Sequence, residues 1–285
     1  MALFTLLFVL LMERTQLLGK RLQFERFMAS YRRWMFDDRA LKNPLKMLFV
    51  LLLPAVVVAL LAKWLTGTLF GLPHLLLWIV VGLLVFGHRA LRDRFRHYLM
   101  AANRNDSQAC YHTLETLDHA ASEAADSPQT LGVQMGQVAA WLNYRYYAAV
   151  ALYFVAFGPA AALFYSTVRG YHDHFAREQI RRPLVVPLMH LLDWVPARLV
   201  ALGFALSGHF SKAMAVLLPR LFDPLCPARQ LITEVALAAE ETPEPGEEDA
   251  PISVQPTVAL LKLAKRNLVL LLVVVSVLTI LGIVH

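Results

Sequence analysis

Long apolar runs constrain this chain more than any other feature, because a helix of about 20 apolar residues spans the hydrocarbon core of a bilayer. Residues 45–62 and 75–87 are two such runs, and the short turn between them predicts a helical hairpin. Residues 146–168 form a third run, which a Gly-Pro pair interrupts, and residues 267–284 form a fourth without any charged side chain. Strand patterns are nearly absent, so these runs predict membrane-spanning helices.

Composition agrees with a membrane protein, since 58% of the residues are hydrophobic, 17% are charged and the mean hydropathy is +0.51. A soluble domain is nearer half apolar and a quarter charged. We therefore predict an all-α fold, a polytopic membrane helical bundle with about four full spans plus broken or interfacial helices. The run at 2–12 is too short to span alone, and the run at 184–208 is long enough but polar at its centre, so whether either spans stays open.

The distribution of basic residues predicts the topology. Residues 13–46 and 88–145 hold 15 of the 27 Lys and Arg residues, so both regions are expected to face the cytoplasm. The turn at 66–73 has no charge and is expected on the opposite side, whereas the four arginines of 169–183 give no clear side. We read the net charge of +6 as topology, so the expected partner is the lipid bilayer and not nucleic acid.

Three parts are expected along the chain. Residues 1–238 form a membrane domain that includes a cytoplasmic helical region at 88–145. Residues 239–257 hold six acidic residues, four prolines and no basic residue, which is typical of a disordered linker. Residues 258–285 form a C-terminal transmembrane helix.

The stretch "NRNDS" at 103–107 is a cluster of polar side chains at a predicted break between helices. Asp106 or Ser107 is a good N-cap for the next helix, which is a purely structural role. Arg104 beside Asp106 could equally hold a phosphate, directly or through a metal. Both interpretations stay open.

The stretch "HLLDWVPARL" at 190–199 places polar groups inside an apolar run. Pro196 has no N–H to donate, so the helix is expected to stop near Trp194 and to restart as a second half-helix. Asp193 and Arg198 then form a structural pair, or line a polar cavity at the break, because ionisable groups at such depth are costly. An amphipathic helix in the interface is a further alternative.

Other candidate ligands carry less weight. His112, Glu115 and His119 follow the spacing i, i+3, i+7, which could bind a metal on one helical face, although a solvated face is favoured. Cys110 and Cys226 lie far apart without a CxxC motif and imply neither a metal site nor a disulfide framework.

Four stretches resemble, in this order, the AmpE family of inner-membrane proteins of Gram-negative bacteria: "MALFTLLFVLLMER", "AANRNDSQA", "WLNYRYY" and "LLDWVPARLVALGFALSGH". The resemblance covers essentially the whole chain. It implies a multi-pass protein of the bacterial inner membrane, associated with the cytosolic amidase AmpD, which trims recycled muropeptides. It also implies a signalling role in β-lactamase induction and antibiotic resistance, with a nucleotide and Mg²⁺ as the candidate cofactor.

The AmpE family is in turn similar to the cobinamide-phosphate synthases (CobD/CbiB), membrane enzymes that form an amide bond with ATP and magnesium. Residues 196–198 match the end of their pattern D-D-x-x-N-x-x-P-A-R, whereas its aspartates fall on Met189 and His190 and its asparagine on Asp193. Residues 105–107 echo an upstream R-D-T/S element. The resemblance implies the fold and a polar pocket. It does not imply the synthase activity, because Mg²⁺ prefers carboxylate oxygens and the two aspartates of the pattern are replaced here.

We therefore predict that the two clusters face each other across a polar pocket on the cytoplasmic side. Arg104 and Arg198 would hold an anionic group, Asp106 and Asp193 would orient these arginines or bind a metal cation, and His190 would line the pocket or carry a proton. The predicted ligand-binding residues are Arg104, Asp106, Ser107, Asn143, Arg145, His190, Asp193 and Arg198, and the predicted metal ligands are Asp106 and Asp193.

Two functional classes follow. The first is an inner-membrane sensor or regulatory protein, linked to cell-wall recycling and β-lactamase induction, that binds an anionic or cell-envelope-derived ligand and is expected to form a homodimer. The alternative is a membrane enzyme, a nucleotide-dependent ligase or transferase acting on an amphiphilic or cell-envelope substrate. The substituted acidic residues favour the first class, and the dense polar clusters favour the second.

Overall fold

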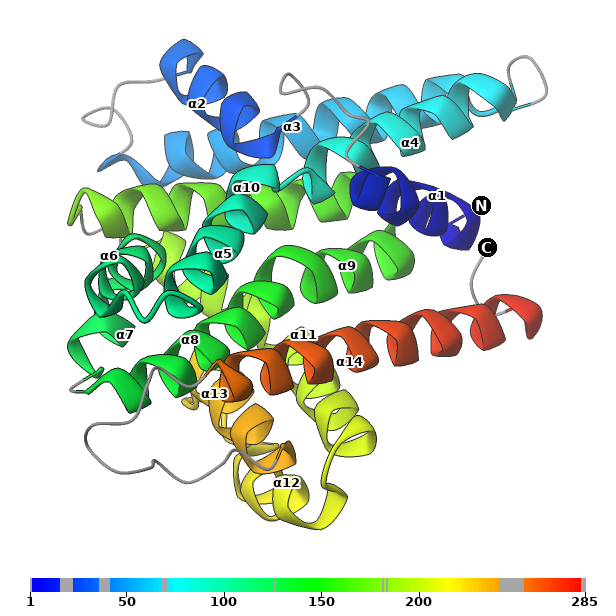
Figure 1. The fold of residues 1–285 in the computed structure, drawn as a ribbon. Helices are drawn as coiled ribbons and strands as arrows, with labels where there is room; N and C mark the ends of the chain where they lie inside the picture. Colours follow the sequence, from blue (N-terminus) through cyan, green and yellow to red (C-terminus); the bar gives the residue numbers. More distant parts are fainter. Residues whose placement is uncertain are drawn as a thin grey trace. The chain divides into compact units, whose positions relative to one another are not determined.

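The structure is a computed structural model, and it describes residues 2–15, 23–35, 42–67, 71–125, 127–180, 182, 184–240 and 254–282. All regular elements within these residues are helices, which confirms the predicted all-α fold (Figure 1). The chain divides into two compact units, and we describe each by itself. Residues 241–253 of the predicted linker lie outside the described residues.

Unit 1 comprises Met1–His88, Ala149–Asp193 and Val273–His285. Its helices are α1 (Ala2–Thr15), α2 (Phe24–Trp34), α3 (Pro44–Leu65), α4 (Leu72–Phe86), α9 (Ala149–Phe157), α10 (Pro159–Arg177) and the first part of α11 (Val185–Ser207). Helix α10 is central, because it packs against α2, α3, α4 and α9, and α1 packs against α4 and α9.

Unit 2 comprises Arg89–Ala148 and Trp194–Leu272. Its elements are α5 (Arg89–Ala102), α6 (Ser107–Leu117), α7 (His119–Glu123), α8 (Pro128–Asn143), the π-helical turn η3 (Tyr144–Ala148), the rest of α11, α12 (Phe210–Leu217), the 3₁₀ turn η4 (Leu218–Arg220), α13 (Ala228–Ala239) and most of α14 (Gln255–Ile280). Helix α8 packs against α6, α7 and α13, and α12 packs against α13.

Four helical segments among the described residues are long and apolar enough to cross a membrane: Pro44–Leu65, Leu72–Ala102, Val185–Ser207 and Gln255–Ile280. Their number agrees with the predicted four spans, and the helical hairpin of α3 and α4 is confirmed. Helix α14 begins at Gln255, three residues before the predicted start of the last part.

The predicted interruption of the run at 146–168 by Gly158 and Pro159 is confirmed, and neither half is among the described helices that are long and apolar enough to cross a membrane. Helix α9 ends at Phe157, and Gly158 then adopts a φ of 83°, a left-handed conformation that glycine accepts readily. Helix α10 starts afresh at Pro159 and is too polar for a candidate span, since it continues through Arg169 to Arg177. The run at 184–208, which the sequence left open, is a candidate span in its place.

The predicted break at Pro196 is wrong, because α11 runs without interruption through this proline. A proline inside a helix deprives the carbonyl four residues earlier of its N–H partner. That carbonyl belongs to Leu192, and the Tyr153 hydroxyl donates a hydrogen bond to it at 2.8 Å. A side chain from α9 thus satisfies the group that Pro196 leaves open, and the helix has no need to break.

The same arrangement occurs in α3, which contains Pro54. The carbonyl four residues earlier is that of Val50, and the Tyr31 hydroxyl of α2 donates to it at 2.8 Å. Burial raises the pKa of Tyr31 to about 12, so its hydroxyl keeps the proton that it donates. Two helices that contain internal prolines therefore stay continuous because a tyrosine from a neighbouring helix replaces the missing donor.

Candidate functional site

The carboxylate of Asp193 lies on α11 within unit 1 and is 4% exposed. The buried Tyr165 hydroxyl of α10 donates a hydrogen bond to its Oδ1 at 2.8 Å. The Tyr165 ring in turn stacks on Tyr153, with ring centroids 5.0 Å apart. Tyr165 therefore contacts the carboxylate directly, and Tyr153 packs against Tyr165. His190 is half-buried one helical turn earlier on α11.

Arg198 lies on the part of α11 that belongs to unit 2, and its guanidinium group holds a neighbouring segment of backbone. Nε donates to the carbonyl of Leu221 at 2.7 Å, Nη2 donates to that of Asp223, and Nη1 donates to that of Trp194 at 2.8 Å. The guanidinium carbon lies 4.3 Å from the centre of the Trp194 ring. Arginine has five N–H donors, so these contacts leave two for any ligand.

Sequence reasoning missed the segment that Arg198 holds, 221–226, which ends in the buried Cys226. Asp223 shapes the segment, because its Oδ1 accepts a hydrogen bond from the Leu225 N–H at 2.9 Å. Burial raises the pKa of the Cys226 thiol, against the opposing effects of Arg220 and Arg198. The sequence signal that could have indicated this segment is the turn-forming stretch "FDPLCP" between two apolar helices.

The predicted residues Asn143 and Arg145 flank the point where α8 turns into η3. Arg145 is 9% exposed, and its guanidinium carbon lies 5.4 Å from the centre of the Trp141 ring. Tyr144, between these two residues, is fully buried, and it belongs to unit 2 as Arg198 does. Short π-helical turns such as η3 are frequent at functional sites.

Of the two interpretations of the stretch "NRNDS", the structure confirms the helix cap by Asp106. The Asp106 carboxylate caps α6 by accepting a hydrogen bond from the Ala109 N–H at 2.9 Å, and Asn105 turns the chain with a φ of 53°. Arg104, Asp106 and Ser107 are exposed. They belong to unit 2 and Asp193 belongs to unit 1, so their convergence on one pocket stays a prediction.

The structure does not assemble the predicted histidine face. Helix α6 ends at Leu117 and Asp118 caps α7, so His112 and His119 belong to different helices. His112 instead lies 3.6 Å from Glu115 in an exposed pair, which agrees with a solvated face. Among the residues that the structure describes, no group of three or more His, Cys, Asp or Glu is placed to hold a metal ion.

A buried cation in unit 1 also escaped sequence reasoning. Arg169 lies inside α10 and is fully buried. Its Nη2 lies 3.3 Å from His88 Nε2, and its guanidinium carbon lies 5.3 Å from the centre of the Phe24 ring. From the sequence, the four arginines of 169–183 gave no clear side of the membrane, and only the packing of α2 and α4 on α10 shows that the first of them is internal.

Comparison with known proteins gives one consistent result. The family model described as "Regulatory signalling modulator protein AmpE" matches residues 1–285. A curated relative, "Protein AmpE" of Shigella flexneri, is 31% identical to the chain over 99% of each of the two proteins. No solved structure matches. The family description supports a regulatory role, and neither description gives support to a ligase.

Proposed function

The chain belongs to the AmpE family of regulatory signalling modulators, and on this premise we propose that it links cell-wall recycling to β-lactamase induction from the bacterial inner membrane. The observation that carries this proposal is the family match over all 285 residues. The four helical segments suited to crossing a membrane support a multi-pass protein.

We further propose that the protein reads an anionic, cell-envelope-derived ligand through the polar residues of α11 and of the α8–η3 junction. Asp193, Arg198 and Arg145 are all less than 10% exposed. Ionisable side chains are costly inside membrane proteins and usually mark a functional site. Arg104, Asp106, Ser107, Asn143 and His190 complete the proposed set.

The chemistry of these residues favours binding over catalysis. Arg198 already donates three hydrogen bonds to backbone carbonyls, and Asp106 caps a helix. Met189 and His190 stand where the similar synthases have aspartates, so the chain lacks those two Mg²⁺ ligands. A site of this kind can recognise a charged ligand without the carboxylates that would position a magnesium nucleotide.

Replacing Asp193 by asparagine tests the proposal. The Asp193→Asn variant keeps the shape and an oxygen that accepts the Tyr165 hydrogen bond, but it removes the negative charge. Leu191→Ala is the matched control, because Leu191 lies on the same helix and is 70% exposed. Each variant would replace the chromosomal gene in a strain with inducible β-lactamase.

We expect Asp193→Asn to abolish the rise in β-lactamase activity after a β-lactam inducer is added, with a normal amount of protein in the inner-membrane fraction. Leu191→Ala should induce like the wild type. Wild-type induction by Asp193→Asn would contradict the proposed site. Wild-type induction in a strain that lacks the whole gene would contradict the proposed function.

A further inference from the structure

Helices α12 and α13 of unit 2 form a hairpin with the turn that joins them. The two helices pack against each other, and the hairpin closes where it begins. The His209 N–H donates to the Ala239 carbonyl at 2.7 Å, and a Cβ at Gly208 would lie 2.3 Å from the same oxygen. We call these three residues the base of the hairpin, and residues 218–225 its tip.

Arg198 holds the tip against α11 at a defined distance from the base. Its guanidinium group donates to the carbonyls of Leu221 and Asp223. Arg198 stands ten residues before Gly208, so these bonds place the tip about 15 Å from the base, measured along α11. The hairpin therefore lies alongside the second half of α11, and its tip points toward the middle of that helix.

Helix α14 contacts α11 between the tip and the base of the hairpin. The Asn267 side chain donates to the Val200 carbonyl at 3.1 Å and lies against Gly203. The residue before it, Arg266, forms an ion pair with Glu240, which directly follows the base. Helix α14 therefore passes the base first and runs antiparallel to this part of α11.

The charges of α14 place the membrane boundary at this contact. Residues 267–280 hold no charged side chain, whereas three basic residues precede them closely: Lys262, Lys265 and Arg266. Basic residues at the end of an apolar helix mark the interface between hydrocarbon and water. The boundary therefore lies near the level of Asn267 and Gly203, with the base on the aqueous side and the tip on the membrane side.

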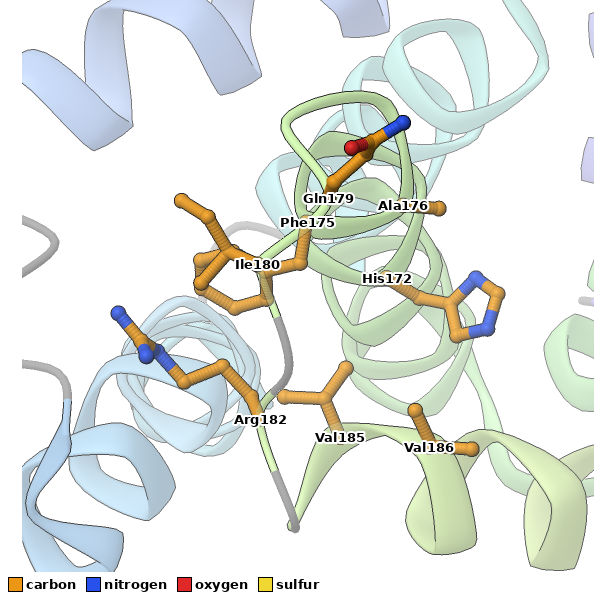
Figure 2. A pocket seen from close by; sticks show the side chains of 8 residues that line it. All are labelled: His172, Phe175, Ala176, Gln179, Ile180, Arg182, Val185 and Val186. Atoms are coloured by element: carbon orange, nitrogen blue, oxygen red, sulfur yellow. The ribbon is translucent and has the colours of Figure 1, made fainter.

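The other end of α11 agrees with this boundary. The described residues around the start of α11 include the polar side chains of Gln179 and Arg182, which line a cavity together with Val185 (Figure 2). From Val185 to Gly203 the helix rises by about 27 Å, close to the roughly 30 Å of a bilayer core. Arg198 lies five residues inside the second boundary, so the tip reaches about 7.5 Å into the membrane. Interfacial elements insert their apolar side chains by roughly 5–10 Å.

Large apolar side chains cover the outside of the tip. Leu218 is 57% exposed, Phe222 is 81% exposed and Leu225 is 84% exposed. Apolar surface gathered in one place marks a contact with another protein or with a membrane, and the depth of the tip decides for the membrane. The neighbouring Asp223 is also exposed, which agrees with a position near the headgroups and not at the centre of the bilayer.

The backbone of the tip is suited to surroundings that offer little water. Two of its carbonyls accept hydrogen bonds from Arg198. The Asp223 N–H donates to the Arg220 carbonyl at 3.3 Å, and the Leu225 N–H donates to the Asp223 carboxylate at 2.9 Å. Backbone groups that lack a partner are costly where water is scarce, and the pairing of these groups within the protein removes that cost.

We propose that the tip of this hairpin inserts into the interface of the bilayer, with Leu218, Phe222 and Leu225 among the upper acyl chains and Asp223 among the headgroups. The partner of this surface is the lipid itself and not a second protein chain. The hairpin thus gives unit 2 a hold on the membrane in addition to its apolar helices. This inference does not depend on the proposed regulatory function, so either one can fail without the other.

Fluorescence from single sites tests the depth of the tip. Phe222→Cys and Leu225→Cys are each labelled with the dye NBD in the full chain, which is held in phosphatidylcholine nanodiscs. Both native side chains point outward, so the substitutions disturb little packing. The wild-type chain is the labelling blank, because Cys110 and Cys226 are both buried. Phe210→Cys is the matched control, since Phe210 is 53% exposed and directly follows the base.

We expect the dye at positions 222 and 225 to emit at shorter wavelength than the dye at position 210. Phosphatidylcholine with a nitroxide on an upper acyl carbon should quench the first two positions strongly, and aqueous iodide should quench them little. The control at position 210 should show the reverse. The base and the tip differ by about 15 Å along α11, which exceeds the roughly 5–10 Å of interfacial insertion.

A second measurement uses the chain without any substitution, so it does not depend on the folding of a variant. Phosphatidylcholine with a photoactivatable diazirine on its acyl chain is crosslinked to the wild-type protein in the same nanodiscs. Mass spectrometry then maps the modified peptides. We expect crosslinks within residues 218–225 and none within residues 208–212 near the base.

Three results would overturn the proposal. Iodide quenching at positions 222 and 225 equal to that at position 210, without lipid crosslinks at the tip, would place the tip in water. Protection of positions 222 and 225 from both iodide and the nitroxide lipid would show that another protein chain covers the tip. Equal quenching by the nitroxide lipid at positions 210 and 222 would show that the hairpin does not point toward the membrane.

Discussion

Arg198 connects α11 to the segment 221–226, and its removal should release that segment. The guanidinium group donates to the carbonyls of Leu221 and Asp223, which are distant in sequence, and packs over the Trp194 ring. Arg198→Ala removes all of these contacts at once. Among the described residues, no other group is placed to donate to these two carbonyls. Only solvent that enters as the segment opens could replace the guanidinium group.

The size of the effect follows from the lost contacts. Each carbonyl that loses a charged donor costs about 1–1.5 kcal/mol when water can partly replace the donor. The lost stacking on Trp194 adds roughly 0.5–1 kcal/mol. The segment should therefore open more easily by about 3 kcal/mol, which raises the equilibrium constant for opening by roughly a hundredfold.

Cys226 provides the assay, because it is buried in this segment and the chain has only one other cysteine, Cys110, which is fully buried in α6. We expect a soluble thiol reagent to label Cys226 roughly a hundredfold faster in Arg198→Ala, while Cys110 stays protected. Mass spectrometry distinguishes the two sites. Electrostatics alone would act in the opposite direction, since Arg198 lowers the pKa of the Cys226 thiol and its loss would slow the reaction.

Arg220→Gln is the control within the same region. Arg220 forms an ion pair with Glu234 at 2.6 Å, with about a third of each side chain exposed, and such pairs contribute only about 0.5 kcal/mol. Labelling of Cys226 should therefore change about twofold at most in this variant. An Arg198→Ala rate within twofold of the wild type, or one matched by Arg220→Gln, would refute the role assigned to the guanidinium group.

Three further predictions concern stability. Tyr153→Phe should destabilise the protein by about 1–2 kcal/mol in thermal unfolding, because it leaves the partly buried Leu192 carbonyl without a donor. The same substitution should have little effect in a Pro196→Ala background, where the backbone donor returns. Gly203→Ala should also lower the melting temperature, because its Cβ would lie 2.0 Å from Oδ1 of Asn267, and Asn267→Ala should restore much of the loss. Asp106→Ala should cost about 1 kcal/mol through loss of the α6 cap, measured by the same method, and a null effect would show that solvent replaces the cap.

Local features were predictable wherever a short stretch of sequence satisfies its own physical needs. The hairpin of α3 and α4 follows from two apolar runs around a short turn, and Asn43 and Pro44 mark the start of α3. The cap by Asp106 follows from a short polar side chain just before a helix. None of these features depends on a distant partner.

The candidate site was predictable only in part, for the same reason. The sequence identified Asp193 and Arg198 because charged residues inside an apolar run stand out. It gave no indication that Tyr165 holds the first residue or that the carbonyls of 221–226 hold the second, because these contacts join segments more than 20 positions apart. The burial of Arg169 likewise depends on which helices surround α10.

Sequence by itself therefore determined that this chain is a membrane protein built from helices, because apolar length and periodicity act over about 20 adjacent residues. Tertiary structure decided which of those helices are continuous. Pro196 alone predicts a break, since it leaves the Leu192 carbonyl without a backbone donor. The helix continues because Tyr153, 39 positions away, donates to that carbonyl, and a hydrogen bond between distant segments forms only once the helices have packed.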